Sequence, residues 1–229
     1  NMVAAGEQSG TLDLVLDLDR RLHRRLSKVA GKAHAVLLEP AEFAHLTFNL
    51  RRPLFRDPRL RQALARLLDR RKLASTLPGP RAQLLDGPLW RHGPQRRAAL
   101  GTGPRHDPAE AAKLLRAAGW SRTSGRWMKN GQPLQFTLLT ALRSTATNRG
   151  LRAIRDDLKK AGVTLVVRKV LWGQLVVALR KRQFDAVVLV TPLHGPWSDL
   201  GDLGHTKASA AGGNHAGLRE PAFDKLLDR

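Results

Sequence analysis

The chain has 229 residues, enough for one large α/β domain or two small ones, and 42% of them are hydrophobic, so it can bury a full core. It has no cysteine, which excludes a disulfide framework and any thiolate metal site. Forty lysines and arginines face nineteen acidic residues, and the resulting net charge of +21 favours anionic partners such as nucleic acid, an anionic membrane surface or an acidic ligand.

The positive residues are spread along the chain, from Arg20 to Arg229, rather than gathered in a tail. Such a spread favours arginines on solvated faces over a dedicated binding tail. No run approaches the ~18 apolar residues that a membrane-spanning helix needs, and no signal peptide opens the sequence. An exported protein without its leader would begin this way, and so would a cytosolic one.

The first fifty residues contain three candidate strands. Residues 12–18 (LDLVLDL) alternate apolar and polar side chains, as a half-buried strand does. A basic amphipathic segment at 20–30 follows and ends at Gly31. Residues 34–38 and 45–50 are predicted to form two further short strands.

Asp57-Pro58 opens the clearest helix of the first half, with aspartate as the N-cap and proline at the first helical position. The predicted helix runs to Arg71, and its apolar residues fall at helical spacing: Leu60, Ala63, Leu64, Leu67 and Leu68. Residues 77–106 are rich in proline, glycine and arginine, which predicts a long surface loop.

Asp107-Pro108 repeats the same start signal, and the helix at 109–118 is predicted to stop at Gly119 as its C′ residue. Asn130-Gly131 predicts a two-residue turn between strands at 126–128 and 134–139.

Strands and helices then alternate to residue 190. We expect strands at 136–140, 163–168 and 184–190, with helices at 145–161 and 172–182. This alternation is typical of parallel βαβ units, and it predicts an α/β fold with a mixed, mainly parallel sheet flanked by helices.

The common enzyme signatures are absent: the sequence contains no GxxxxGK[ST], GxGxxG, HExxH or GxSxG. Five residues near the C-terminus could ligate a metal in a folded loop, namely His194, Asp199, Asp202, His205 and His215. Their spacing matches no fixed template, so we interpret them as solvated loop residues. We expect no catalytic residue, no metal and no cofactor.

The predicted helix at 57–71 could also lie along nucleic-acid phosphates, because it carries five arginines. Aromatic residues are only 5% of the chain and tyrosine is absent, so stacking platforms for single strands are scarce. No helix-turn-helix or other base-reading motif adjoins the helix. A basic nucleic-acid-binding module is therefore an alternative hypothesis and not the favoured one.

Six segments of the sequence carry a resemblance to a known family. They are LTFNLRRPLFRDPRLRQALARLLDRRKL (46–73), DPAEAAKLLRAAGW (107–120), NGQPLQFTLLT (130–140), KKAGVTLVV (159–167), FDAVVLV (184–190) and GGNHAGLREPAFDKLLD (212–228). In this order they resemble the signature segments of extracellular solute-binding proteins of family 5, the peptide/nickel type. The matching residues of the first segment are Asn49, Pro53, Phe55, Asp57, Arg61, Gln62, Ala63, Leu64, Asp69 and Arg70.

The resemblance implies a periplasmic-binding-protein-like (class II) fold, in which two lobes close on a ligand about a hinge. It assigns residues 1–50 to the end of lobe I and the hinge-crossing strands, and residues 51–229 to lobe II, incomplete at the C-terminus. It implies the substrate-binding component of an ABC importer, which captures an oligopeptide or similar small solute and delivers it to a membrane permease. We expect a monomeric, periplasmic or cell-surface protein, lipid-anchored or soluble.

The resemblance also implies candidate ligand residues. Trp172 lies twelve residues before Phe184 and matches a tryptophan that walls the ligand pocket in the family, although it could equally pack its helix on the sheet. Asn214 matches a family asparagine that could contact ligand or cap a turn.

Peptide-binding members carry an aspartate after the FD strand, which pairs with the amino terminus of the peptide. Counted without gaps, that position falls on His194; with a small insertion, Trp197-Ser198-Asp199 restores it. The anchor has therefore either moved to Asp199 or been lost. We expect this loop to face the ligand cleft at the carboxyl end of strand 184–190, near Trp172.

One cytosolic alternative is the ligand-sensing domain of a transcription regulator, since some regulators fuse a DNA-binding head to a family 5 domain. The ligand stays open among oligopeptides, sugars, metal chelates and opine-like solutes. Because one lobe supplies only half of a closed pocket, we expect this chain to fold but to bind solutes weakly by itself.

Overall fold

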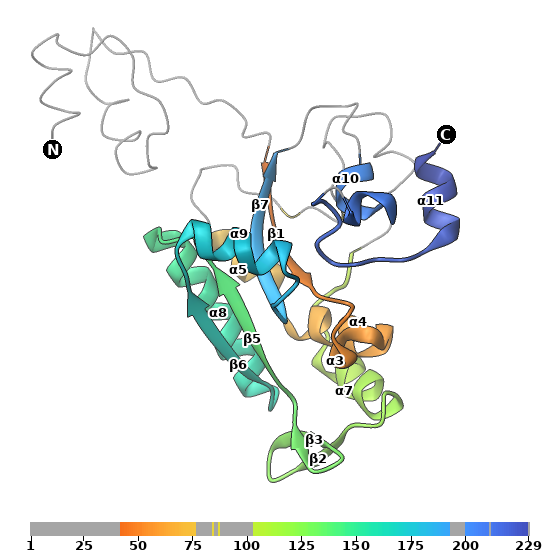
Figure 1. Ribbon diagram of the computed structural model, residues 1–229. Helices are drawn as coiled ribbons and strands as arrows, with labels where there is room; N and C mark the ends of the chain where they lie inside the picture. The colour runs from red at the N-terminus through yellow and green to blue at the C-terminus, as the bar shows by residue number, and fades with distance from the viewer. Residues whose placement is uncertain are drawn as a thin grey trace, which may run out of the picture. The chain divides into compact units, whose positions relative to one another are not determined.

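The computed structural model describes residues 42–76, 84, 87, 103–192, 200–210 and 212–228. Its main feature is a four-stranded sheet with the order β1-β7-β5-β6 (Figure 1). The strands are β1 (Glu42–Phe48), β5 (Gln135–Thr140), β6 (Thr164–Lys169) and β7 (Ala186–Pro192). β5 runs parallel to β6 and β7, and β1 lies antiparallel to β7 at the edge. The predicted mixed, mainly parallel α/β sheet is therefore confirmed, whereas the elements predicted before residue 42 lie outside the described residues.

Helices cover both faces of this sheet, because β5 carries apolar side chains on each. Phe136 and Leu138 point to one face, where they pack with α8 (Thr145–Lys160) through Leu151 and Leu158. α4 (Pro58–Leu67) and α7 (Pro108–Ala117) join the same core. Leu139 points to the opposite face, which α9 (Trp172–Arg180) covers.

Three phenylalanines fix the end of β1 against the core. Phe48 stacks on Phe55 with ring centroids 4.7 Å apart, and Phe55 meets Phe136 edge-on at 5.4 Å. Phe55 lies in the short helix α3 (Pro53–Arg56) and is fully buried. Each such aromatic pair adds about 0.5–1.5 kcal/mol beyond area burial. The segment between Phe48 and Phe55 is therefore held at both ends.

The helix predicted at 57–71 is wrong in one respect, because two helices occupy this stretch. α4 ends at Leu67, Leu68 is extended, and α5 (Arg70–Thr76) begins after Asp69. The Asp69 carboxylate accepts a hydrogen bond from Lys72 N at 3.1 Å, as an N-cap does, and its own N–H is held by Asp157 at 3.2 Å. This local capping outweighs the continued leucine spacing.

The predicted helix starts at Asp57 and Asp107 and the predicted helix end at Gly119 are confirmed. Asp57 and Asp107 accept hydrogen bonds from Arg59 N and Glu110 N, each at 2.9 Å. Gly119 and Gly162 follow α7 and α8 as C′ residues with φ of +83° and +85°.

Asn130-Gly131 forms the predicted two-residue turn, since Lys129 pairs with Gln132 across it and both turn residues have positive φ. The partner strand differs from the prediction. The hairpin belongs to a separate small sheet of β2 (Ser121–Thr123), β3 (Arg126–Lys129) and β4 (Gln132–Pro133), and β5 joins the main sheet instead.

The described C-terminal part consists of short elements: α10 (Gly201–Gly204), the 3₁₀ turn η2 (Lys207–Ser209) and α11 (Pro221–Leu227). His205 joins them, because its Nε2 donates to Asp228 at 3.1 Å while its Nδ1 accepts from Lys207 N at 3.0 Å. The backbone N–H of Thr206 lowers the pKa of the Asp224 carboxyl, and the hydrogen bond from His205 lowers the pKa of Asp228.

Candidate ligand-binding face

The carboxyl ends of β5, β6 and β7 meet at one edge of the main sheet, which is where ligands bind in open α/β sheets. β5 ends at Thr140, which is fully buried and whose carbonyl accepts a hydrogen bond from Val170 N at 3.0 Å. β7 runs on to Pro192 with β1 as its partner. This edge is the natural place for a ligand-binding face.

Trp172 begins α9 at this edge, three residues after β6 ends. The Gln174 side chain accepts a hydrogen bond from Leu171 N at 2.9 Å and so caps the start of the helix. Trp172 is 66% exposed, whereas Leu175 and Leu179 are buried and pack α9 on the sheet. The alternative in which Trp172 packs its own helix is therefore not supported, and its indole is available to a ligand.

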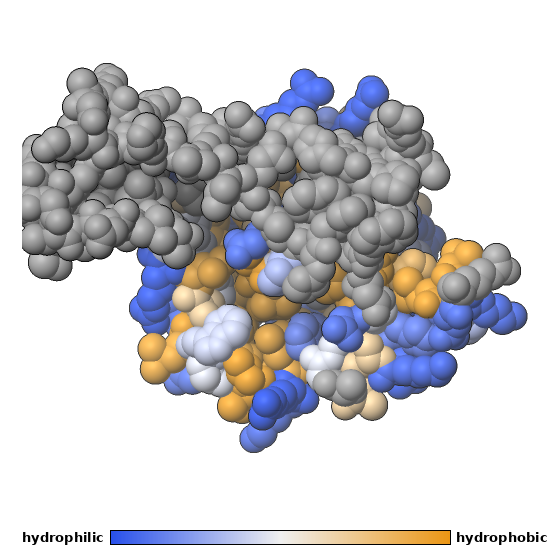
Figure 2. Space-filling model, turned by 90° about the horizontal axis from the view of Figure 1, so that it is seen from above, coloured by the Kyte–Doolittle hydropathy of each residue, from blue (hydrophilic) through white to orange (hydrophobic). Residues whose placement is uncertain are grey.

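Leu171, which precedes Trp172, adds apolar surface beside it, since Leu171 is 62% exposed. Figure 2 looks at the molecule from this end and shows apolar surface bordered by hydrophilic side chains. Ligand pockets combine apolar walls with a few polar groups in this way.

The four loop residues singled out in the sequence, His194, Trp197, Ser198 and Asp199, lie outside the described residues. The structure describes residues up to Pro192 and again from Leu200. The expectation that this loop faces the cleft stays a prediction, as does the position of the amine anchor.

Asn214 is only 1% exposed and its side chain is fully occupied inside its own loop. Its Nδ2 donates to the carbonyls of Gly204, His205 and Leu218 at 2.9–3.3 Å. Its Oδ1 accepts from Gly217 N at 3.0 Å and Leu218 N at 2.9 Å. These bonds favour the turn-capping alternative over direct contact with ligand.

Sequence reasoning missed His45, which lies in β1 and pairs with Leu189 in the carboxyl-terminal half of β7. Its two ring nitrogens lie 2.8 Å from the hydroxyls of Thr47 and Thr191. Burial, with the nearby charge of His215, lowers the pKa of His45 from 6.5 to about 4. The polar alternation of His45 and Thr47 was the available signal, although it looks like an ordinary solvated strand face.

Arg51 and Arg182 were missed for a different reason, and His215 was considered only as a candidate metal ligand. Arg51, Arg182 and His215 converge on one pocket, but 33 to 164 positions of sequence separate them. No local motif connects residues so far apart, so only the fold brings them together.

The metal hypothesis finds no geometric support in the described part of the chain, where no three His, Asp or Glu side chains gather as ligands. Within the same residues, no helix is long and apolar enough to cross a membrane.

Residues 1–203 match the family model described as bacterial extracellular solute-binding proteins, family 5 Middle. The oligopeptide-binding protein AppA of Bacillus subtilis is 27% identical over 194 residues, which cover 81% of this chain and 35% of AppA. The chain thus spans about a third of the length of this curated relative.

Solved structures share the fold. AppA from Bacillus subtilis, in complex with a nonapeptide, has a TM-score of 0.74 at 24% identity over 82% of this chain and 38% of its own. Lactococcal OppA, complexed with an endogenous peptide in the closed conformation, has a TM-score of 0.78 at 16% identity over 97% and 45%. NikZ from Campylobacter jejuni, in complex with Ni(L-His), has a TM-score of 0.74 at 20% identity over 99% and 46%.

Proposed function

The chain belongs to family 5 of the bacterial extracellular solute-binding proteins, and from this premise we propose that it is lobe II of a protein that captures an oligopeptide or similar small solute for an ABC permease. Members of this family are periplasmic or extracellular substrate-binding components of ABC importers and not enzymes. Under this proposal residues 1–50 complete lobe I and cross the hinge, and residues 51–229 form lobe II.

The observation that carries the proposal is the exposed indole of Trp172 at the carboxyl edge of the sheet. An indole supplies a large apolar area with few rotatable bonds, so covering it contributes affinity at a small entropic cost. Leu171, which is 62% exposed, extends the apolar surface beside Trp172. Residues 193–199 follow β7 in the sequence, and under the proposal Asp199 or His194 supplies polar contacts to the ligand.

The lobe arrangement explains how such a face could serve transport. One open face gives a solute contacts on a single side, and a second lobe is needed to bury it. Closure then converts ligand binding into a shape that a permease can distinguish from the empty form. The regulator alternative and the nucleic-acid alternative are not favoured, because the family match is to transport proteins.

The test is calorimetric titration with nonapeptides of mixed composition, on the 229-residue chain and on the protein that, under this proposal, also carries the first lobe. We expect weak binding by the chain and at least 10-fold tighter binding by the two-lobed protein. Trp172→Ala should weaken the latter about 10-fold, which corresponds to ~1.4 kcal/mol. Val177→Ala is the matched control, because Val177 is another exposed apolar residue of α9, 50% exposed.

Two results would contradict the proposal. Micromolar binding by the isolated chain would mean that the pocket is complete within it and that the lobe assignment is wrong. Equal loss of affinity in both variants would remove Trp172 from the binding face.

A further inference from the structure

A basic pocket lies at the opposite edge of the sheet from Trp172, where β1 ends and β7 begins. Phe48 pairs with Ala186 at this edge. The pocket has a volume of about 310 Å³ and is lined by residues from three separate parts of the chain. Arg51 follows β1, Arg180 and Arg182 come from the end of α9 and the turn after it, and the loop at 209–215 closes the third side.

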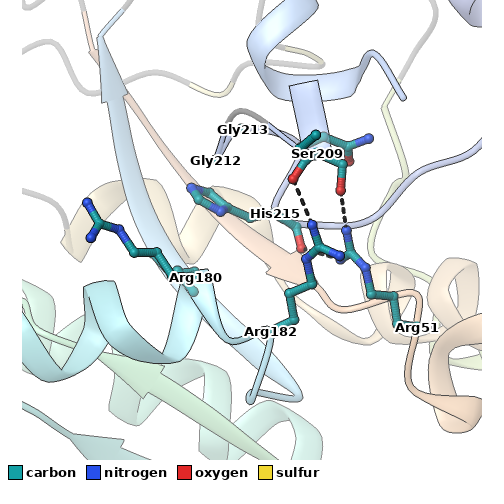
Figure 3. A pocket seen from close by; sticks show the side chains of 10 residues that line it. Arg51, Arg180, Arg182, Ser209, Gly212, Gly213 and His215 are labelled. Atoms are coloured by element: carbon teal, nitrogen blue, oxygen red, sulfur yellow. Dashed lines mark hydrogen bonds between the residues drawn. The ribbon is translucent and has the colours of Figure 1, made fainter. Parts of the chain in front are cut away.

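The positive charges of this pocket have neutral hydrogen-bond partners. Arg51 donates from Nη2 to Ser209 Oγ at 2.6 Å, and from Nη1 to the His215 carbonyl at 3.1 Å and to Asn49 Oδ1 at 3.5 Å. Arg182 donates from Nη2 to the Ser209 carbonyl at 2.8 Å. Figure 3 shows these two guanidinium groups side by side below Ser209, with Arg180 on the other side of the His215 ring.

Carboxylates are missing from the lining, as far as the described residues go. None of Arg51, Arg180 and Arg182 forms an ion pair with a described acidic side chain, and the nearby Asp185 is paired with Arg52 at 3.2 Å. A cluster of cations without a counter-ion is costly, and burial increases the cost because low-dielectric surroundings screen charges poorly.

The pKa values of Arg51 and His215 reflect this cost, because both are lowered. Burial, together with the charges of Arg182 and Arg219, lowers the pKa of Arg51. Burial and the charge of Arg51 lower the pKa of His215. Both shifts have the direction expected when cations are held close together by the fold. A bound anion would oppose both shifts, because it favours the charged forms.

We propose that this pocket is a second binding site, separate from the solute-binding face, and that it takes a phosphate group, either free or carried by a larger molecule. Guanidinium groups present several N–H donors in a planar fork that matches phosphate oxygens, and arginine clusters recognise phosphate for this reason. The backbone of Gly212 and Gly213 lines the same cavity without side chains, so a ligand can approach it closely. The volume leaves room for a small organic group beside the phosphate.

The site would connect parts of the chain that the sequence separates widely. A phosphate held by Arg51, Arg180 and Arg182 would bridge the end of β1, the end of α9 with the turn after it, and the segment around Ser209 and His215. Ligand bound in this way stabilises the folded chain in proportion to the logarithm of its concentration. Binding should therefore be visible in the stability of the protein as well as in direct titration.

The experiment is titration of the full chain with inorganic phosphate, at an ionic strength held constant with sodium chloride. Calorimetry measures affinity, and NMR follows the amide signals of Gly212 and Gly213 against those of Gly131 and Gly150 as references. We expect one saturable site, with shifts at Gly212 and Gly213 only. Arg180→Gln should weaken binding at least 10-fold, and its guanidinium has no hydrogen bond or ion pair among the described residues, so its loss should spare the fold.

Arg152→Gln is the matched control, because Arg152 is exposed on α8, on the opposite face of the sheet. Equal weakening in both variants would reduce the effect to the general charge of the chain and overturn the proposal. Two further titrations distinguish the sources of the phosphate group, one with glycerol phosphate and one with vesicles containing phosphatidylglycerol. If the chain binds only the vesicles, and Arg180→Gln abolishes that binding, the ligand is a lipid headgroup. If the chain binds in none of the three titrations, the proposal is overturned.

Discussion

Asn49 is the residue of the family signature whose role the structure defines most sharply. It is 1% exposed, and its Nδ2 donates to the carbonyls of Arg182 at 3.0 Å and Phe184 at 2.9 Å. Its Oδ1 accepts from Arg51 N at 3.2 Å. The side chain therefore clamps the end of β1 to the turn that precedes β7.

Replacing Asn49 by alanine removes these three bonds and the weaker one from Arg51 Nη1 at 3.5 Å. The Phe184 carbonyl keeps a second donor, Arg52 Nε at 3.2 Å, whereas no other described donor reaches the Arg182 carbonyl. A buried group left without a partner costs about 1–3 kcal/mol and a hydrogen bond lost from a satisfied one about 1 kcal/mol. We expect Asn49→Ala to lower the free energy of unfolding by about 2–4 kcal/mol.

Urea unfolding followed by circular dichroism measures this change, and the thermal midpoint should fall by about 2–4 °C for each kcal/mol. Asn148→Ala is the control, because Asn148 is a more exposed asparagine whose Oδ1 accepts from Lys169 Nζ at 2.6 Å at the surface. It should cost less than about 1 kcal/mol. A loss below 1 kcal/mol in Asn49→Ala would refute the clamp.

Three further outcomes are expected. The pKa of His45 is about 4 in the folded chain and 6.5 when unfolded, so protonation of His45 favours unfolding. The free energy of unfolding should therefore be constant above about pH 6.5 and fall by roughly 3 kcal/mol towards pH 4. Urea midpoints should show this fall in the wild-type chain and a flatter pH dependence in His45→Gln. Gly162→Ala should cost at least about 1–2 kcal/mol by thermal unfolding, because φ is +85° and a Cβ would press on the Gly125 carbonyl; Gly173→Ala, with nothing near its Cβ, should be neutral or better. Duplex DNA should be held only weakly and released by moderate salt in filter-binding assays, and sequence-specific retention at physiological salt would contradict this.

The mainly parallel sheet could be predicted from the sequence because its strands and helices carry local signals, although its strand order could not. β5, β6 and β7 are short apolar runs separated by helices of the right length, and right-handed crossovers leave few other arrangements. The break between α4 and α5 escaped prediction because Leu68 continues the leucine spacing. What stops the helix is the Asp69 carboxylate, together with Asp157 from α8, and the second partner is visible only in the fold.

The polar groups of the two sites could be predicted only in part. Trp172 could be proposed because the family resemblance places a pocket tryptophan twelve residues before Phe184. His45 and Arg51 were not, because the contacts that define them join residues 146 and 158 positions apart, Thr191 in one case and Ser209 in the other. Hydrogen bonds of this range leave no periodicity in a sequence.

Some of the positive residues also have local structural roles, which the composition conceals. Arginine side chains satisfy backbone carbonyls where elements end: Arg61 donates to the Phe55 and Arg56 carbonyls at 2.6 and 2.9 Å, after α3. Lys129 does the same for the Ala118 carbonyl after α7, at 2.7 Å. The last carbonyls of a helix lack partners within it, and long cationic side chains are well suited to reach them.

The same bonds weaken the nucleic-acid hypothesis. Of the arginines of α4, Arg59 is held by both carboxylate oxygens of Asp57, at 2.8–3.2 Å, and Arg61 is bound to the carbonyls of α3. Arg66 bonds back to the Gln62 carbonyl at 3.2 Å. A phosphate backbone binds side chains that can all turn towards one line of charges, and arginines already committed to separate local acceptors must first give up those bonds. Arg51 and Arg182 also bond to local acceptors, Ser209 and the His215 carbonyl, but their guanidinium groups line one cavity together with Arg180.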